Sequence, residues 1–252
     1  MEKKIYSNAE DLFQNEYISY TRISSYEQCP YLFKLKYLKK CPSTSSRAAE
    51  LGKTVHAVIA SYLNTINNST NTQKVELSHL CDEIEPTCDM LLDTGETNYE
   101  FDTYEIKPLL EGFMNFMPYV NPNEIHCIEE EKNFHLNGLK YKCILDLILK
   151  DSSGNFTVID FKTGKPKYVE DKQIKLYSIP IFKDFSPSSI KLIYAFLRFY
   201  TTEEYDFSFQ ESQAYEDIMH RKVCRIMEDD TFDPRNSFLC RYCDVRDYCD
   251  YG

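Results

Sequence analysis

Two aspartates and a lysine stand inside apolar segments of the 252-residue chain, where charged side chains are costly. Asp146 lies within CILDLIL, and Asp160 and Lys162 lie within FTVIDFK. Because side chains alternate along a strand, Asp160 and Lys162 share one face. Two carboxylates that hold a divalent cation beside an ammonium group could hydrolyse a phosphodiester. The competing interpretation is a solvated edge strand with a surface ion pair, which the Asp-x-Lys spacing alone favours.

Three further residues are candidates for the same site. His56 lies in the otherwise apolar segment LGKTVHAVIASYL, where a histidine is either a satisfied core residue or a metal ligand. Gln173 and Tyr177 are four residues apart on the helix predicted after the Asp-x-Lys strand, so they share one helix face. They could hold a phosphate or the lysine, or pack as ordinary helix residues.

In order and setting, these residues resemble the PD-(D/E)XK nucleases, specifically the RecB-like branch. That pattern has a helical histidine, an aspartate on one strand, an acidic-x-Lys strand and a Gln-x-x-x-Tyr helix. The resemblance implies that His56, Asp146 and Asp160 bind Mg²⁺ or Mn²⁺ and that Lys162 assists the attacking water. The remaining catalytic positions that it implies are Gln173 and Tyr177.

The match leaves two positions open. Leu145 stands where the superfamily name has proline, a position that is often relaxed. One more acid could join the site, and the sequence does not choose among Glu129, Glu130 and Glu131.

Cysteines form a second constellation. Cys240, Cys243 and Cys249 supply three thiolates over ten residues, so a closed site needs a fourth ligand from elsewhere. Spacing alone favours structural zinc and does not distinguish it from an iron–sulfur cluster. RecB-like nucleases of the AddB and CRISPR-associated type bind a [4Fe–4S] cluster with one cysteine before the nuclease core and three after it, which implies Cys29 as the fourth ligand here. The other cysteines are interpreted as packing or incidental thiols: Cys41, Cys81, Cys88, Cys127, Cys143 and Cys224.

Hydrophobic periodicity predicts the elements that must position these residues. A capping box from Ser24 to Glu27 predicts the start of a first helix. Helical spacing of apolar residues predicts a second helix over 49–66, and a helical pattern returns over 74–118 after a polar loop at 67–73. Asn137-Gly138 predicts a hairpin turn within 126–150. Further strands are expected at 156–162, 189–200 and 203–209. The segment 170–182 is expected to be helical as far as Pro180, and a last helix is expected at 210–229.

This order predicts an α/β (α+β) fold with a central mixed sheet flanked by helices. The resemblance implies that the fold is of the restriction-endonuclease-like type. We expect one RecB-like nuclease domain over 1–252. It would comprise a mainly helical part at 1–120 with Cys29, a sheet core at 121–209, and a C-terminal helix and cluster-binding loop at 210–252. A helical insertion at 64–118 is the alternative.

Net charge and composition exclude several classes of protein and indicate a cellular compartment. Forty acidic against 29 basic residues give a net charge of −11, which excludes a protein that coats polyanions through net charge. No apolar stretch approaches the roughly 20 residues of a membrane span, and the N-terminus lacks the apolar region of a secretory signal. Ten cysteines without an export signal indicate a reducing, cytoplasmic location.

The resemblance implies a metal-dependent DNA exonuclease that acts on single-stranded ends. The resemblance implies products with a 5′-phosphate and a 3′-hydroxyl, and a role in CRISPR spacer acquisition or in recombination and repair, with the corresponding integration or recombination proteins as partners. A non-catalytic iron–sulfur or zinc DNA-binding subunit is the alternative. Lysines that could follow a DNA backbone are Lys34, Lys36, Lys39, Lys40, Lys165 and Lys167, although each could equally be a solvated surface residue.

Overall fold

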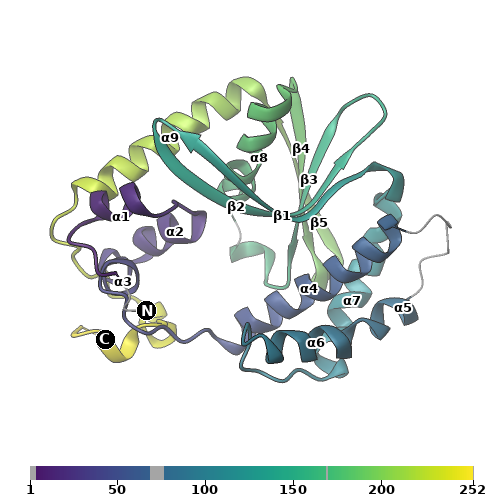
Figure 1. The fold of residues 1–252 in the computed structure, drawn as a ribbon, viewed down its shortest axis with the longest axis horizontal. Coiled ribbons are helices and arrows are strands. Elements are labelled where there is room, and N and C mark those ends of the chain that lie inside the picture. The colour runs from purple at the N-terminus through teal and green to yellow at the C-terminus, as the bar shows by residue number, and fades with distance from the viewer. Residues whose placement is uncertain (1–3, 69–76, 169, 252) are drawn as a thin grey trace. The chain divides into compact units, whose positions relative to one another are not determined.

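The computed structural model describes residues 4–68, 77–168 and 170–251 (Figure 1). The chain divides into two compact units, each assembled from separate stretches. Unit 1 comprises Met1–Ser46, Lys132–Cys143 and Gln213–Gly252, and unit 2 comprises Arg47–Glu131 and Ile144–Ser212.

Five strands form one mixed sheet in the order β1-β2-β3-β4-β5. They are β1 (Ile125–Leu136), β2 (Leu139–Lys150), β3 (Phe156–Lys162), β4 (Ser189–Phe196) and β5 (Thr201–Ser208). β3 pairs with β4 in parallel, whereas β2–β3 and β4–β5 are antiparallel. The predicted hairpin is confirmed, since Asn137 and Gly138 both have positive φ, as a two-residue type I′ turn requires.

Helices of unit 2 cover the sheet. α4 (Arg47–Asn68) and α7 (Thr103–Phe116) pack with strand residues such as Ile159 and Phe161 in one core, which α5 (Leu77–Asp82) and α6 (Ile84–Asp93) extend. α8 (Lys172–Phe185) contacts β3 and β4 and lies on the other side of the sheet in Figure 1. The expected mixed sheet flanked by helices is therefore confirmed.

Unit 1 contains α1 (Ala9–Asn15), α2 (Tyr20–Gln28), α3 (Pro30–Phe33) and a π-helical turn at Lys34–Leu38. It also holds all but the first residues of α9 (Phe209–Glu228) and the 3₁₀ turns Phe238–Tyr242 and Arg246–Tyr248. Within the described ranges, no helix has both the length and the apolar character that a bilayer crossing requires.

The structure corrects the predicted capping box. Ser19, not Ser24, caps this helix, and its hydroxyl accepts from the backbone N–H of Arg22. Ser24 already lies inside α2, where its hydroxyl donates to the carbonyl of Thr21 and therefore cannot cap a helix start. The chain breaks at Cys29, and Pro30 begins α3 as expected for proline in a first turn.

Two other boundaries differ from the sequence prediction. Pro180 lies inside α8 and does not end it, because proline removes only one helix hydrogen bond and the residues around it are buried. α8 ends instead at Phe185 and is followed by its capping residue Ser186, which has a left-handed backbone. The strand expected to reach Tyr200 stops at Phe196, and a 3₁₀ turn over Leu197–Phe199 leads into β5.

α4 is longer than predicted. It continues to Asn68, so the first two residues of the expected polar loop are helical. Residues 69–73 of that loop lie outside the described residues.

Candidate active site

The end of β3 carries the acid–lysine pair that the sequence singled out. Ile159 and Phe161 enter the core with α4 and α7, so alternation turns Asp160 and Lys162 to the other face. Lys162 Nζ lies 2.6 Å from Asp160 Oδ2, and the two side chains are only 19% and 5% exposed. This is a buried ion pair rather than the solvated surface pair of the competing interpretation.

His56 lies beside two carboxylates. Its Nδ1 atom is 3.3 Å from Glu129 Oε1 and 3.4 Å from Asp146 Oδ2, while its Nε2 atom is 2.9 Å from the carbonyl oxygen of Phe161. Because a carbonyl can only accept, Nε2 carries a hydrogen and donates it to Phe161. The Nδ1 lone pair of neutral His56 is then free for a ligand at the carboxylates, the orientation that metal-binding histidines typically have.

Phe161 holds two of these groups through its backbone. Its N–H donates to Asp146 Oδ2 at 2.7 Å, and its carbonyl accepts from His56. Its ring packs against Phe113 and Phe116 of α7. The packing of β3 therefore fixes the relative positions of Asp146 and His56.

Glu129 is the acid that the sequence left undecided among three glutamates. It has φ +46° within β1, a left-handed conformation that is uncommon for a residue with a side chain. In a regular strand Glu129 and Glu131 would point to the same side, so periodicity could not choose between them. The local backbone distortion brings Glu129 to His56, and such strain is concentrated at functional sites.

Electrostatics at this group favour a positive charge. Burial lowers the pKa of His56, but the charges and hydrogen bonds of Asp146 and Glu129 outweigh burial and raise this pKa well above 6.5. Without a cation, His56 therefore takes up a proton between the two carboxylates. A bound cation would supply the same positive charge and release that proton.

The donor set fits a hard divalent ion. Ligand atoms of His56, Glu129 and Asp146 all lie within 4.8 Å of one another. Burial raises the pKa of Asp160 to about 6, against the lowering effect of Lys162 and with a further increase from the charge of Asp146. Among the described residues, Oδ2 of Asp160 is buried without a well-directed hydrogen bond. Carboxylate oxygens with one imidazole suit Mg²⁺ or Mn²⁺.

Lys162 is held by the two helical residues that the sequence proposed. Its ammonium group donates to Gln173 Oε1 at 2.8 Å, and Gln173 Nε2 donates to the hydroxyl of Tyr177 at 3.0 Å. The i, i+4 spacing on α8 thus produces a relay that orients the lysine. Of the three interpretations weighed for this pair, the one in which it holds the lysine agrees with the contacts.

Tyr194 is a site residue that sequence reasoning missed. It is fully buried on β4 as the cross-strand partner of Asp160, and its ring lies 5.2 Å from Lys162 Nζ. Its hydroxyl accepts from the N–H of Ile174 and donates to the carbonyl of Glu170, which ties the first turn of α8 to the sheet. A tyrosine inside the apolar segment IKLIYAF was the available signal.

Substituting Tyr194→Phe should therefore displace α8 without removing any acid, base or lysine. We expect an unfolding free energy lower by about 1–3 kcal/mol, because buried groups lose their partners. Turnover should also fall, since α8 carries Gln173 towards Lys162. Urea unfolding and nuclease assays would measure the two effects, and unchanged values in both would contradict this role.

The lysines that the sequence proposed for DNA binding lie partly in unit 1 and partly in unit 2. In unit 1, Lys36 pairs with Asp244 and Lys40 with Glu16, so much of the predicted DNA-tracking stretch is occupied by internal ion pairs. In unit 2, Lys165 and Lys167 are exposed on the segment that directly follows Lys162. Of the lysines considered, these two are therefore placed next to the candidate site.

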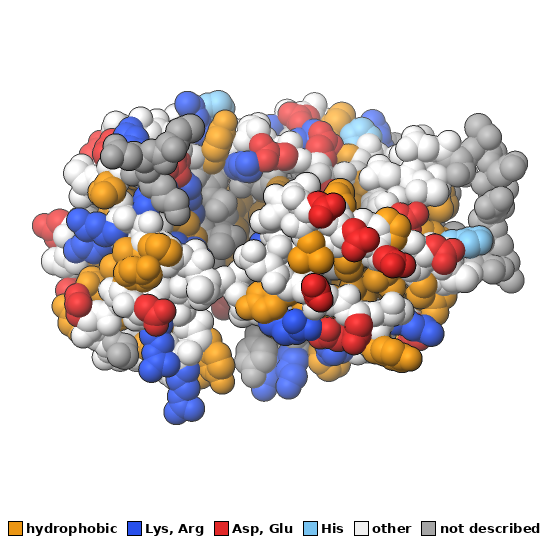
Figure 2. All heavy atoms as spheres, turned by 60° about the horizontal axis from the view of Figure 1, so that its bottom comes forward, with side chains coloured by type: hydrophobic (Ala, Val, Ile, Leu, Met, Phe, Trp, Pro, Cys, Tyr) orange, Lys and Arg blue, Asp and Glu red, His pale blue; other side chains and the backbone are white. Residues whose placement is uncertain are grey.

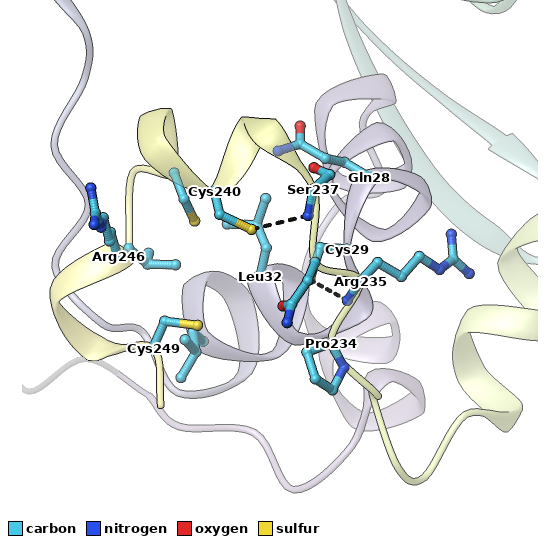
Figure 3. Close-up of a pocket in the computed structure, with 13 residues that line it drawn as sticks. Gln28, Cys29, Leu32, Pro234, Arg235, Ser237, Cys240, Arg246 and Cys249 are labelled. Atoms are coloured by element: carbon cyan, nitrogen blue, oxygen red, sulfur yellow. Dashed lines mark hydrogen bonds between the residues drawn. The ribbon is translucent and has the colours of Figure 1, made fainter. Parts of the chain in front are cut away.

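The four cysteines of the second constellation line one cavity in unit 1. Its volume is about 30 Å³, and Figure 3 shows Cys29, Cys240 and Cys249 approaching it from different segments, with Cys243 also in the lining. Backbone N–H groups donate to two of the sulfurs, from Arg235 to Cys29 at 3.3 Å and from Ser237 to Cys240 at 3.4 Å. Residues distant in sequence thus form a sulfur-lined hollow.

Comparison with solved structures supports the fold assignment. A protein described as a "putative exonuclease" from Eubacterium rectale is similar with a TM-score of 0.53 at 13% identity, over 96% of this chain and 93% of its own. The protein SSO0001 gives a TM-score of 0.37 at 16% identity, over 80% of this chain and 94% of its own. At these identities the first similarity concerns the fold alone, and the second is too weak to support an argument.

Sequence comparison identifies the family. No curated protein matches the chain. Residues 17–250, however, match the family described as the PD-(D/E)XK nuclease superfamily. That span includes the acid–lysine strand, the Gln-x-x-x-Tyr helix and both groups of candidate ligands. The family that the sequence motifs resembled is thereby confirmed: the chain belongs to the PD-(D/E)XK nuclease superfamily.

Proposed function

We propose that this nuclease is a divalent-metal-dependent DNA exonuclease that acts on single-stranded ends. The observation that carries the proposal is the convergence of His56, Glu129 and Asp146 within 4.8 Å, next to the buried Asp160–Lys162 pair. Family membership supplies the reaction class, hydrolysis of a phosphodiester bond.

His56, Glu129 and Asp146 form the group that would hold Mg²⁺ or Mn²⁺. Asp160, whose buried Oδ2 lacks a well-directed hydrogen bond, would complete the ligand set. Such an ion, when bound, lowers the pKa of a coordinated water and neutralises charge on the phosphate. Glu129 extends the ligand set predicted from sequence, which was His56, Asp146 and Asp160.

Lys162 has a separate task. Gln173 and Tyr177 fix its ammonium group beside Asp160, so it is held ready before substrate arrives. An ammonium group in this place can orient the attacking water or stabilise negative charge that develops on the phosphate. The exposed Lys165 and Lys167 would contact neighbouring phosphates.

The proposed preference for single strands rests on charge. Unit 2 carries 13 Lys and Arg against 26 Asp and Glu, and Figure 2 shows acidic side chains over its face at the right. Such a surface repels a rigid duplex with its dense phosphates, whereas a flexible strand can approach Lys165 and Lys167 alone.

Degradation of end-labelled oligonucleotides tests this function. We expect Mg²⁺ or Mn²⁺ to support stepwise release from a linear single strand, chelation to abolish it, and rising salt to weaken it. A circular single strand is the control, because an exonuclease must leave it intact. Faster cleavage of blunt duplex, or activity that persists with EDTA, would contradict the proposal.

For unit 1 we propose that Cys29, Cys240, Cys243 and Cys249 bind a [4Fe–4S] cluster. The four cysteines line one cavity of unit 1, and the order of one cysteine before the nuclease core and three after it is that of the RecB-like cluster proteins that the sequence resembles. N–H donors to Cys29 and Cys240 are the kind of contact that tunes cluster sulfurs.

Substituting Cys29→Ala should remove iron, visible absorption and stability together, because metal binding is coupled to folding. Cys88→Ala is the matched control, since Cys88 lies on α6 of unit 2. Iron and sulfide analysis of anaerobically purified protein, with melting curves, measures these losses. Full iron content in the Cys29→Ala variant would exclude Cys29 as a ligand, and zinc without sulfide in the parent protein would exclude the cluster.

The biological setting remains an expectation from the resemblance. Ten free thiols are consistent with a reducing compartment, and we therefore place the activity in the cytoplasm. Trimming of single-stranded ends would suit spacer acquisition or recombination. If purified protein binds DNA without hydrolysing it under the assay above, the alternative of a non-catalytic DNA-binding subunit replaces the exonuclease.

A further inference from the structure

A second cavity, which belongs to unit 2, lies at the end of β4 and has a volume of about 220 Å³. We refer to it as the tyrosine pocket. Helix α7 and the turn after it form one wall, and the ends of β4 and β5 with the turn between them form the other. Its lining residues are Gly112, Asn115, Phe116, Tyr119, Ala195, Phe196, Leu197, Tyr200, Thr201 and Thr202.

The lining combines exposed aromatic rings with neutral polar groups. Tyr119 is 73% exposed and Tyr200 is 50% exposed, so both rings can be reached from solvent. The ring of Tyr119 lies 5.8 Å from that of Phe116. Tyr200 has φ +53°, a strained backbone of the kind found at functional sites. None of the lining residues carries a formal charge.

The tyrosine pocket is adjacent to the candidate active site. Phe196 of its lining is the direct cross-strand partner of Lys162, and paired strands lie about 4.8 Å apart. Arg198 Nε also donates to the carbonyl of Thr163 at 3.5 Å, so the turn that leads to Tyr200 is tied to the residue after Lys162. Lys162 and Phe196 are the last residues of the parallel strands β3 and β4, so they lie at the same edge of the sheet, with the Lys162 side chain on one face and the pocket on the α7 face. A single strand that crosses this edge from Lys162 would bring a neighbouring nucleotide to the pocket.

We propose that the tyrosine pocket binds one unpaired base of the DNA strand being cut. This inference rests on the proposed function and names a subsite for its substrate. Tyrosine rings stack on any base, and the amide of Asn115 with the hydroxyls of Thr201 and Thr202 can bond to base edges. A phosphate is disfavoured because the lining has no Lys or Arg. Only an unstacked base can enter, which gives a physical reason for single-strand preference.

An abasic scan tests the subsite. Single-stranded oligonucleotides, each lacking one base near the labelled end, would be bound by the Lys162→Ala variant, which should bind DNA but cut it about 10²–10³-fold more slowly. We expect one position at which base removal weakens binding about five- to a hundredfold, the range for loss of one base–aromatic stack. Tyr119→Ala and Tyr200→Ala should weaken binding of intact DNA similarly and abolish the penalty at that one position.

Tyr104→Ala is the matched control, because Tyr104 is a tyrosine of α7 that is 89% exposed and lies outside the pocket lining. It should leave the abasic profile unchanged. A penalty that persists in both pocket variants, or no sensitive position at all in a protein that degrades single strands, would overturn the subsite while leaving the exonuclease proposal intact. Failure of the parent protein to bind or cut any single strand would overturn both.

Discussion

Replacing Lys162 by alanine is expected to slow hydrolysis of single-stranded DNA by about 10²–10³-fold, the usual effect of removing one electrostatic donor from an active site. The carboxylates remain, so Mn²⁺ should still bind. Its affinity should even rise, because the variant lacks the ammonium group 2.6 Å from Asp160. Single-turnover rates and calorimetric Mn²⁺ titration would measure the two effects.

The Asp160→Ala variant should fail in a different way. It removes a buried carboxylate, so affinity for Mn²⁺ should fall together with turnover. Lys191→Ala is the matched control, since Lys191 is a half-exposed β4 lysine paired with Glu204. Neither active-site variant should change the visible spectrum that the proposed cluster gives to unit 1. Parent-like rates in Lys162→Ala or Asp160→Ala would refute the proposed active site.

The local periodicity of one strand and one helix was sufficient to predict four residues of the candidate site. Asp160 and Lys162 lie on an apolar strand, so alternation alone places them on one face, and the β3 boundaries Phe156–Lys162 agree with those expected. The helical spacing of Gln173 and Tyr177 similarly predicts one face of α8, and the contacts with Lys162 follow. Each of these inferences needs only the local period of one element.

Other features of the candidate site depend on contacts between helices and strands, which the periodicity of a single element does not encode. Glu129 reaches His56 through a left-handed residue in β1, and no repeat of polar and apolar residues signals such a distortion. Tyr194 acts through hydroxyl bonds to Glu170 and Ile174, which require knowledge of how α8 docks on β4. The tyrosine pocket likewise exists only because α7 meets the turn after β4.

The close approach of α7 to the turn after β4 depends on Gly112, which has no side chain. A methyl group on Gly112 would lie 1.8 Å from the carbonyl oxygen of Leu197, and this neighbour is backbone that cannot rotate away. Gly112→Ala should therefore force α7 and the turn apart. The strain of overpacking is typically about 1–3 kcal/mol and exceeds the gain of about 1 kcal/mol that alanine gives a helix.

Gly52→Ala provides the matched comparison on α4. Its added methyl would lie 3.4 Å from the hydroxyl oxygen of Thr163, an ordinary contact, so the helix gain should make this variant equal to or more stable than the parent protein. For Gly112→Ala we expect a lower unfolding free energy and, in the folded fraction, weaker binding of single-stranded DNA, because Gly112 also lines the tyrosine pocket. Urea titration and anisotropy of a labelled oligonucleotide measure both quantities. Equal stability of the two alanine variants would show that Leu197 does not lie against α7, and would remove the basis for a pocket at this place.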